Sequence, residues 1–114
     1  MKLLLAFVNP EKLWELKKKL FELRTPGMSV DQVMGIGKPL AHMAEMMERH
    51  GAIPKFSTKM RVELVVPDDK VEEVVKAIRE VCYTGNPGDG KVFILPVEDA
   101  LRVRTNERGE AAIK

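Results

Sequence analysis

Glycines and basic side chains gather in residues 84–105, the stretch of the chain best suited to hold an anion. A loop rich in glycine, asparagine and proline ends in Gly-Asp-Gly-Lys at residues 88–91 and leads directly into an apolar segment. Loop glycines let the backbone approach an anion and turn N–H groups toward it, while lysine and arginine supply charge. Arg102 and Arg104 follow, and on an extended segment both would point to one face. The stretch predicts a polyphosphate cradle that lacks the spacing of a Walker loop.

Three motifs occur in order over residues 84–113: T-G-x-x-G-D-G-K-[VI]-F, P-V-E-x-A-x-R-[VI]-R-T and G-E-A-A-I. Together they resemble the C-terminal half of the PII nitrogen-regulatory signalling proteins, and the resemblance extends over residues 2–36 and 59–69. It fails between Lys38 and Thr58. The resemblance implies a non-catalytic signalling protein that binds adenine nucleotide in clefts between the subunits of a homotrimer.

Length and composition limit the class of protein. A chain of 114 residues with 45% hydrophobic side chains predicts one domain over residues 1–114. A net charge of +2 gives no indication of nucleic acid binding. The single cysteine, Cys82, favours a reducing compartment and is expected to be a small buried hydrophobe. The apolar start at residues 3–8 is too short to insert into a membrane, so we expect a cytoplasmic protein.

The hydrophobic pattern predicts the element order β-α-β-β-α-β, a ferredoxin-like α+β sandwich with both helices on one sheet face. Strands are expected at residues 2–8, 28–36, 60–66 and 92–95. The first helix opens at Asn9-Pro10, and the second opens after Pro67 with an aspartate cap. Residues 101–105 are expected to form a short extended piece.

The first and fourth strands are apolar on both faces, although the helices cover only one face of the sheet. Monomers rarely expose so large an apolar surface, which predicts a symmetric oligomer that buries the sheets together. The number three, with the sheets facing the centre, comes from the resemblance alone.

The resemblance also implies which residues contact the nucleotide. Around the phosphates it places the glycine turn at residues 35–38, the B-loop at residues 83–91 and the two arginines of the C-terminal segment, residues 101–114. Around the adenine it places one hydroxyl and the strand near Glu63. The expected nucleotide-binding residues are Ser29, Gly35, Ile36, Gly37, Lys38, Glu63, Val65, Gly88, Asp89, Gly90, Lys91, Arg102 and Arg104. ATP and ADP are the expected ligands, AMP is a third candidate, and a role for Mg²⁺ is left open.

The same residues also have a purely structural interpretation. A Gly-x-Gly pair is commonly a plain turn, and Gly88 with Gly90 can simply shape a helix-to-strand loop. The two arginines can be surface residues that pair with Glu98 or Glu107.

The effector loop, approximately residues 37–58, departs from the family pattern. Pro39 replaces a glutamine that in the family helps to hold Mg²⁺ and 2-oxoglutarate, so we predict that the response to 2-oxoglutarate is lost or weakened. The family's tyrosine motif for uridylylation is absent, and this regulation is predicted to be lost as well. Residues 40–51 instead predict a short methionine-rich helix. We expect residues 38–57 to bind a target protein, for example a membrane transporter or a metabolic enzyme.

Two other function classes remain alternatives. His42, His50 and the methionines at 43, 46 and 47 are ligand types suited to Cu(I), although their spacing matches no tight metal motif. A slow ATPase is the second alternative, although the sequence shows no catalytic constellation.

Overall fold

The computed structural model of the protein describes residues 1–36 and 55–114. Residues 37–54 lie outside the described part. They include the predicted site residues Gly37 and Lys38, and Pro39, on which the predicted loss of the 2-oxoglutarate response depends. The predicted methionine-rich helix and the copper alternative lie there too.

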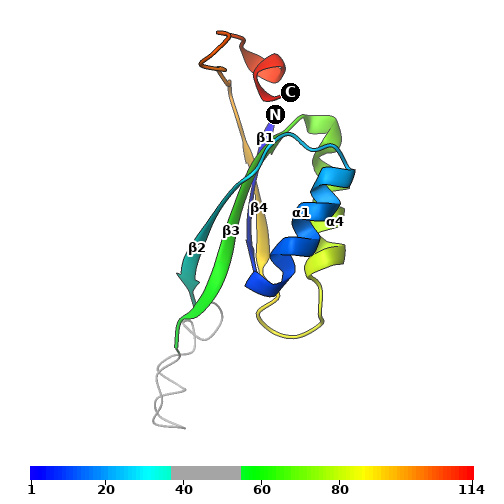
Figure 1. The fold of residues 1–114 in the computed structure, drawn as a ribbon, viewed down its shortest axis with the longest axis vertical. Helices are drawn as coiled ribbons and strands as arrows, with labels where there is room; N and C mark the ends of the chain where they lie inside the picture. The colour runs from blue at the N-terminus through cyan, green and yellow to red at the C-terminus, as the bar shows by residue number, and fades with distance from the viewer. Residues whose placement is uncertain (37–54) are drawn as a thin grey trace.

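The described residues form a four-stranded antiparallel sheet with two helices on one face (Figure 1). The strands are β1 (Lys2–Val8), β2 (Ser29–Gly35), β3 (Ser57–Val66) and β4 (Lys91–Pro96), and the helices are α1 (Leu13–Glu22) and α4 (Val71–Cys82). Short 3-10 turns are η1 (Pro10–Lys12), η2 (Asp68–Lys70) and η3 (Gly109–Ile113). The strand order β2-β3-β1-β4 confirms the predicted ferredoxin-like α+β fold. None of the helices in the described ranges is both long and apolar enough to cross a membrane.

The hydrophobic core lies between the helices and the sheet. Every second residue of the two central strands points toward the helices, as the period of a strand requires. These buried residues are Leu4, Ala6, Val8, Val62, Leu64 and Val66. Leu16 and Leu20 of α1 and Val74 and Ile78 of α4 pack against them. The alternation seen in the sequence of β3 is therefore the alternation between the core and the open face.

The entry into α4 differs from the prediction. Neither aspartate of η2 caps the helix, because the capping position of α4 is Lys70 and that of η2 is Pro67, and no side-chain cap bond forms at either. Asp68 instead accepts a hydrogen bond from the amino group of Met1 at 2.9 Å, and this contact lowers the pKa of its carboxyl group. An aspartate just before a helix predicts a cap, but here a distant partner competes for it.

Cys82 lies at the end of α4 with 6% of its surface exposed, as predicted for a buried hydrophobe. Burial raises the pKa of its thiol from 9.0 to about 11.

Because the thiolate is the reactive form, we expect Cys82 of the folded protein to resist an aromatic disulfide reagent at pH 8 and to react fully in denaturant. The raised pKa also predicts that stability decreases as the pH rises above about 9, where the unfolded chain gains the thiolate first. Labelling of the folded protein at the rate of a free thiol would contradict the protection expected for Cys82.

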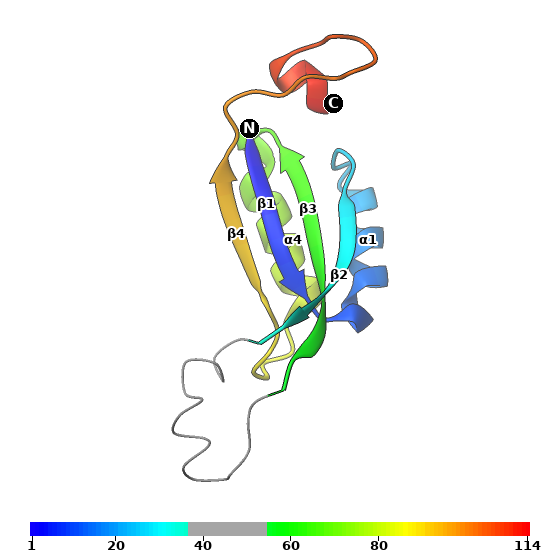
Figure 2. The same ribbon diagram turned by 90° about the vertical axis from the view of Figure 1, so that its left-hand side faces the viewer.

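The sheet face opposite the helices is open in the described part of the chain (Figure 2). Its β1–β4 half is apolar. Leu5 and Phe93 lie opposite each other across the two strands, and the Phe7 and Phe93 rings meet edge to face with centroids 6.2 Å apart. Phe93 is 48% exposed and Leu95 is 39% exposed. The β2–β3 half is polar, so the predicted apolar face covers only half of the sheet.

Candidate functional site

The loop between α4 and β4 is organised by Asp89. The Asp89 carboxylate accepts hydrogen bonds from the Thr84 hydroxyl and from the N–H groups of Thr84 and Gly85, the last two at 2.8 and 3.0 Å. The hydroxyl and these N–H groups hold the pKa of Asp89 below its usual range. Both carboxylate oxygens are engaged within the loop, so the geometry indicates that Asp89 shapes the loop and does not itself face an anion.

We expect the hydrogen bonds that Asp89 accepts from Thr84 and Gly85, which close the loop, to persist at neutral pH and to break in acid. Because the pKa of Asp89 is depressed in the folded protein, its ionised carboxylate stabilises the loop fully above the ordinary aspartate pKa, about 3.9. This stabilisation is lost as the pH falls through the lower pKa of the folded state. NMR can follow the Thr84 and Gly85 amide resonances during an acid titration. They should move together with a midpoint below the ordinary pKa, and they should lose this step in Asp89→Asn. A midpoint at or above the ordinary value would contradict the closure.

Gly90 is required by packing against β1. Its φ is +108°, and a Cβ atom at this position would lie 1.9 Å from the backbone carbonyl oxygen of Phe7. The sequence pattern predicted a glycine for approach to an anion. The structure shows that at Gly90 the close neighbour is the protein's own backbone.

Lys59 is a residue that the sequence analysis missed. Its ammonium group donates hydrogen bonds to the Gly88 carbonyl oxygen at 2.6 Å and to Asn9 Oδ1 at 2.5 Å. A Cβ atom on Gly35 would lie 3.2 Å from its Cγ atom. Lys59 therefore joins the end of β2, the end of β1 and the loop before β4. In β3 it lies opposite Val33, just before residues 60–66, which the sequence predicted as the strand, so the hydrophobic pattern did not mark it.

These contacts define the first group of predicted site residues, at the end of the sheet where β2 ends and β3 begins (Figure 1). Lys91 opens β4 opposite Phe7 with an exposed side chain. Ile36 follows Gly35 directly along the chain. The described members of the first group are Gly35, Ile36, Gly88, Asp89, Gly90 and Lys91.

The second group lines an open cleft of about 410 Å³ near the opposite end of the sheet. Ser29 and Glu63 lie opposite each other on β2 and β3. Val65 and Arg102 line the same cleft, as do residues 112–114 at the end of the chain. The structure thus brings the predicted adenine-side residues together with one of the two predicted arginines.

Arg61 is a second residue that the sequence analysis missed. Its guanidinium donates two hydrogen bonds to Asp31, at 2.9 and 2.8 Å, and its Nε lies 3.6 Å from Glu63 Oε1. The hydrogen bond to Asp31 is the largest cause of the raised pKa of Arg61. The three charges form a row on the polar half of the open face, which limits where the Glu63 carboxylate can lie.

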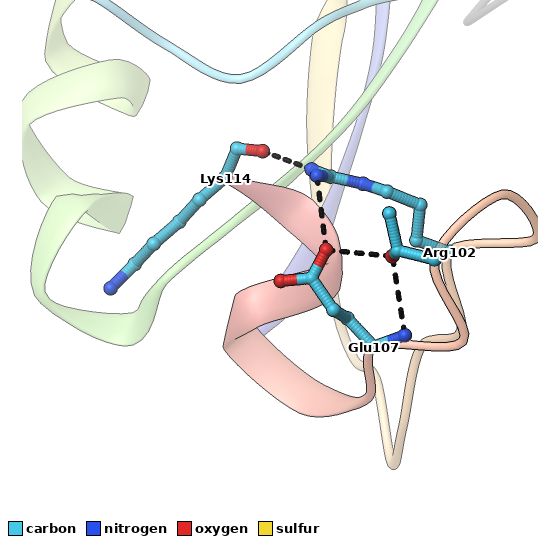
Figure 3. A network of polar contacts seen from close by, with 4 residues as sticks. Arg102, Glu107 and Lys114 are labelled. Atoms are coloured by element: carbon cyan, nitrogen blue, oxygen red, sulfur yellow. Dashed lines mark hydrogen bonds and ion pairs between the residues drawn. The ribbon is translucent and has the colours of Figure 1, made fainter.

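The arginines do not lie on an extended segment, and this prediction was wrong. Leu101 and Arg108 form an isolated bridge, and the chain between them turns back on itself. Arg102 contacts Glu107 Oε1 at 3.4 Å and also donates to the backbone carbonyl of Lys114 (Figure 3). Its pairing with Glu107 agrees with the structural alternative. Arg104 lies in the turn and is exposed, so the two arginines share a loop and not a strand face.

Within one chain the two groups cannot surround the same phosphates. Gly35 lies opposite Ser57 and Ser29 lies opposite Glu63, so the groups are separated by six residues of β3. At about 3.3 Å per residue this separation is about 20 Å, far longer than a triphosphate. Within one chain, Ser29 and Glu63 of the second group therefore lie out of reach of phosphates held by the first group.

Comparison with known proteins agrees with the fold and motifs. A family model described as nitrogen regulatory protein P-II matches residues 1–107. The chain is 41% identical over 113 residues to a nitrogen regulatory protein P-II from Cereibacter sphaeroides, covering 99% of this chain and 100% of that protein. It is 40% identical, with the same coverage, to the protein of that name from Bradyrhizobium diazoefficiens. A nitrogen regulatory protein from Haloferax mediterranei is 38% identical over 112 residues, or 98% of this chain and 90% of the relative.

The match spans both groups of candidate residues, the loop before β4 and the arginine-bearing turn. It also agrees with the resemblance that the motifs of residues 84–113 carried. The chain belongs to the nitrogen regulatory protein P-II family of signal-transduction proteins.

Proposed function

We propose that the protein binds an adenine nucleotide between neighbouring subunits of a homotrimer and uses it to set the state of the effector loop. The observation that carries this proposal is the division of the candidate residues between opposite ends of the sheet, about 20 Å apart. In a closed ring each contact joins two different surfaces of neighbouring copies, which can bring the two groups together.

The open sheet face supports the ring. Its β1–β4 half exposes Phe93, Leu95 and the half-buried Leu5, side chains that a second copy would cover. Burying apolar area at about 25 cal/mol per Å² stabilises such a contact. The exposed charges of the β2–β3 half would remain near the edges of the contact, where water can reach them.

The chemistry of the two groups fits the two ends of a nucleotide. Lys91 supplies a cation beside the glycine loop, and Arg102 with Arg104 would add two more from the neighbouring copy. The open cleft beside Ser29 and Glu63 offers a hydroxyl and a carboxylate for the polar edges of a nucleoside. We expect ATP or ADP to be preferred over AMP, because several cations would converge on the phosphates of such a shared site.

The signal would pass to the loop through Lys59. β2 ends at Gly35 just before the effector loop, and β3 begins at Ser57, at the other end of that loop. Lys59 lies beside Gly35 and donates to Gly88 in the phosphate loop. A phosphate that shifts the Gly88 loop would therefore displace both strands that carry the effector loop. That loop then engages or releases a partner, such as a membrane transporter or a metabolic enzyme.

Calorimetry with ATP, ADP and AMP tests the proposal, with the mass of the oligomer measured on the same samples. We expect a trimer that binds ATP or ADP, with no stimulation by 2-oxoglutarate because Pro39 removes the amide ligand. Absence of binding at millimolar nucleotide would contradict the nucleotide site. Tight, ATP-dependent binding of 2-oxoglutarate would contradict only the Pro39 argument.

A further inference from the structure

The two arginines are carried by a C-terminal hairpin, residues 99–109, that extends beyond the end of the sheet (Figure 2). Its backbone is held by hydrogen bonds from Arg102 N–H to the Glu107 carbonyl at 2.9 Å and from Asn106 N–H to the Arg102 carbonyl at 2.8 Å. In both views the hairpin lies beyond the ends of α1 and α4 (Figures 1 and 2). The direction in which it presents the arginines therefore depends on contacts within the hairpin and on the contact of Arg102 with Lys114.

One carboxylate joins the two ends of this hairpin. Asp99 Oδ1 accepts hydrogen bonds from the N–H groups of Ala100 at 2.8 Å and Gly109 at 3.1 Å. Asp99 Oδ2 accepts from both Nε, at 2.9 Å, and Nη2 of Arg108. Both Asp99 and Arg108 are exposed, so this ion pair contributes little to global stability. Its geometry nevertheless fixes the first residue of the hairpin, Asp99, against the last two, Arg108 and Gly109.

The returning strand of the hairpin carries the partner of Arg102. Glu107 precedes Arg108 directly, contacts Arg102 and accepts a hydrogen bond from the Thr105 hydroxyl at 2.6 Å (Figure 3). A shift of Arg108 would move Glu107 away from Arg102. The Asp99–Arg108 contact thus adds to the backbone hydrogen bond between Arg102 and Glu107 in keeping Glu107 opposite the Arg102 guanidinium.

We propose that Asp99 is a positioning residue for the nucleotide site, acting through Arg108 and the hairpin on Arg102 and Arg104; this inference rests on the proposed function. Asp99 does not touch the nucleotide. It restricts the hairpin to the orientation in which the two arginines reach the phosphates bound by a neighbouring copy. Preorganisation of this kind improves affinity because less freedom is lost on binding.

The test measures ATP affinity by calorimetry on the full-length protein, with the unfolding midpoint recorded for each variant. Asp99→Ala should weaken ATP binding about tenfold with little change in the midpoint. Asp99→Asn keeps an oxygen for the Ala100 and Gly109 amides and should recover part of the loss. Glu98→Ala removes the neighbouring carboxylate, for which the described residues show no hydrogen bond, and should bind ATP like the unchanged protein.

A thermodynamic cycle separates positioning from a general structural role. In the background Arg102→Ala with Arg104→Ala, the further change Asp99→Ala should cause no additional loss, because the groups that it positions are gone. An additive loss in that background, or an unchanged affinity in Asp99→Ala alone, would overturn the inference. If the unchanged protein bound no ATP, the proposed function itself would fail. That result is distinguishable from the two results that would overturn the role of Asp99, because both require an unchanged protein that binds ATP.

Discussion

Replacing Gly90 by alanine is expected to lower the free energy of unfolding by about 3 kcal/mol or more and to abolish nucleotide binding. The new Cβ atom would lie 1.9 Å from the Phe7 carbonyl oxygen, a backbone atom that pairing within the sheet holds in place. The positive φ of +108° adds strain for any residue with a side chain. Either β1 or the loop must move, and both carry the first group of the candidate site. Chemical denaturation and calorimetry measure the two effects.

Gly27→Ala is the matched control for stability. No heavy atom lies within 4 Å of the Cβ position at Gly27, so the same chemical change should leave the free energy of unfolding nearly unaltered. A Gly90→Ala protein as stable as the control would contradict the packing described for the loop.

A charge at Phe93 should convert the oligomer to single chains. Phe93→Asp places a carboxylate in the centre of the apolar half of the open face, beside Phe7 and opposite Leu5. Burying an unpaired charge in a contact between copies costs more than the contact returns. We expect the mass in solution to fall to that of one chain. The affinity for ATP should fall at least about a hundredfold, because the arginines of the neighbour are lost.

Phe21→Asp provides the control for this change. Phe21 is 84% exposed on α1, on the helix side of the sheet. The same substitution there should preserve both the oligomer and ATP binding. If Phe93→Asp stayed oligomeric, the open face would not be the contact between copies.

The fold was predictable because the sequence of each helix and strand carries its own local signal. Period-two alternation in β3, the stripe of α4 and the proline-glycine break after α1 fix the element order, and the order nearly fixes the topology. The start of β3 was missed by three residues, because Ser57 to Lys59 are polar and become a strand only through pairing with β2. The missed cap at Asp68 has a similar cause, since its partner Met1 is 67 residues away.

The candidate site was predictable in its residue types but not in its geometry. The motifs identified the glycine loop and the arginines. They could not show that Gly90 is required by Phe7, that Asp89 closes its own loop, or that Lys59 connects three segments. Each of these depends on which strands lie side by side. The hairpin around Asp99 was not predicted, because apolar and charged residues alternate at residues 101–104 as they do in a strand.

The central claim is that each site combines two copies, and mixing two defective variants tests it most directly. Lys91→Ala removes a cation from the first group and Arg102→Ala removes one from the second, and each alone should weaken ATP binding about tenfold or more. When the two are unfolded and refolded together, random assembly should pair intact halves in about a quarter of the clefts. Calorimetry should then detect tight ATP sites at about a quarter of the stoichiometry of refolded unchanged protein. A mixture without tight sites, while the refolded unchanged protein binds fully, would contradict the shared site.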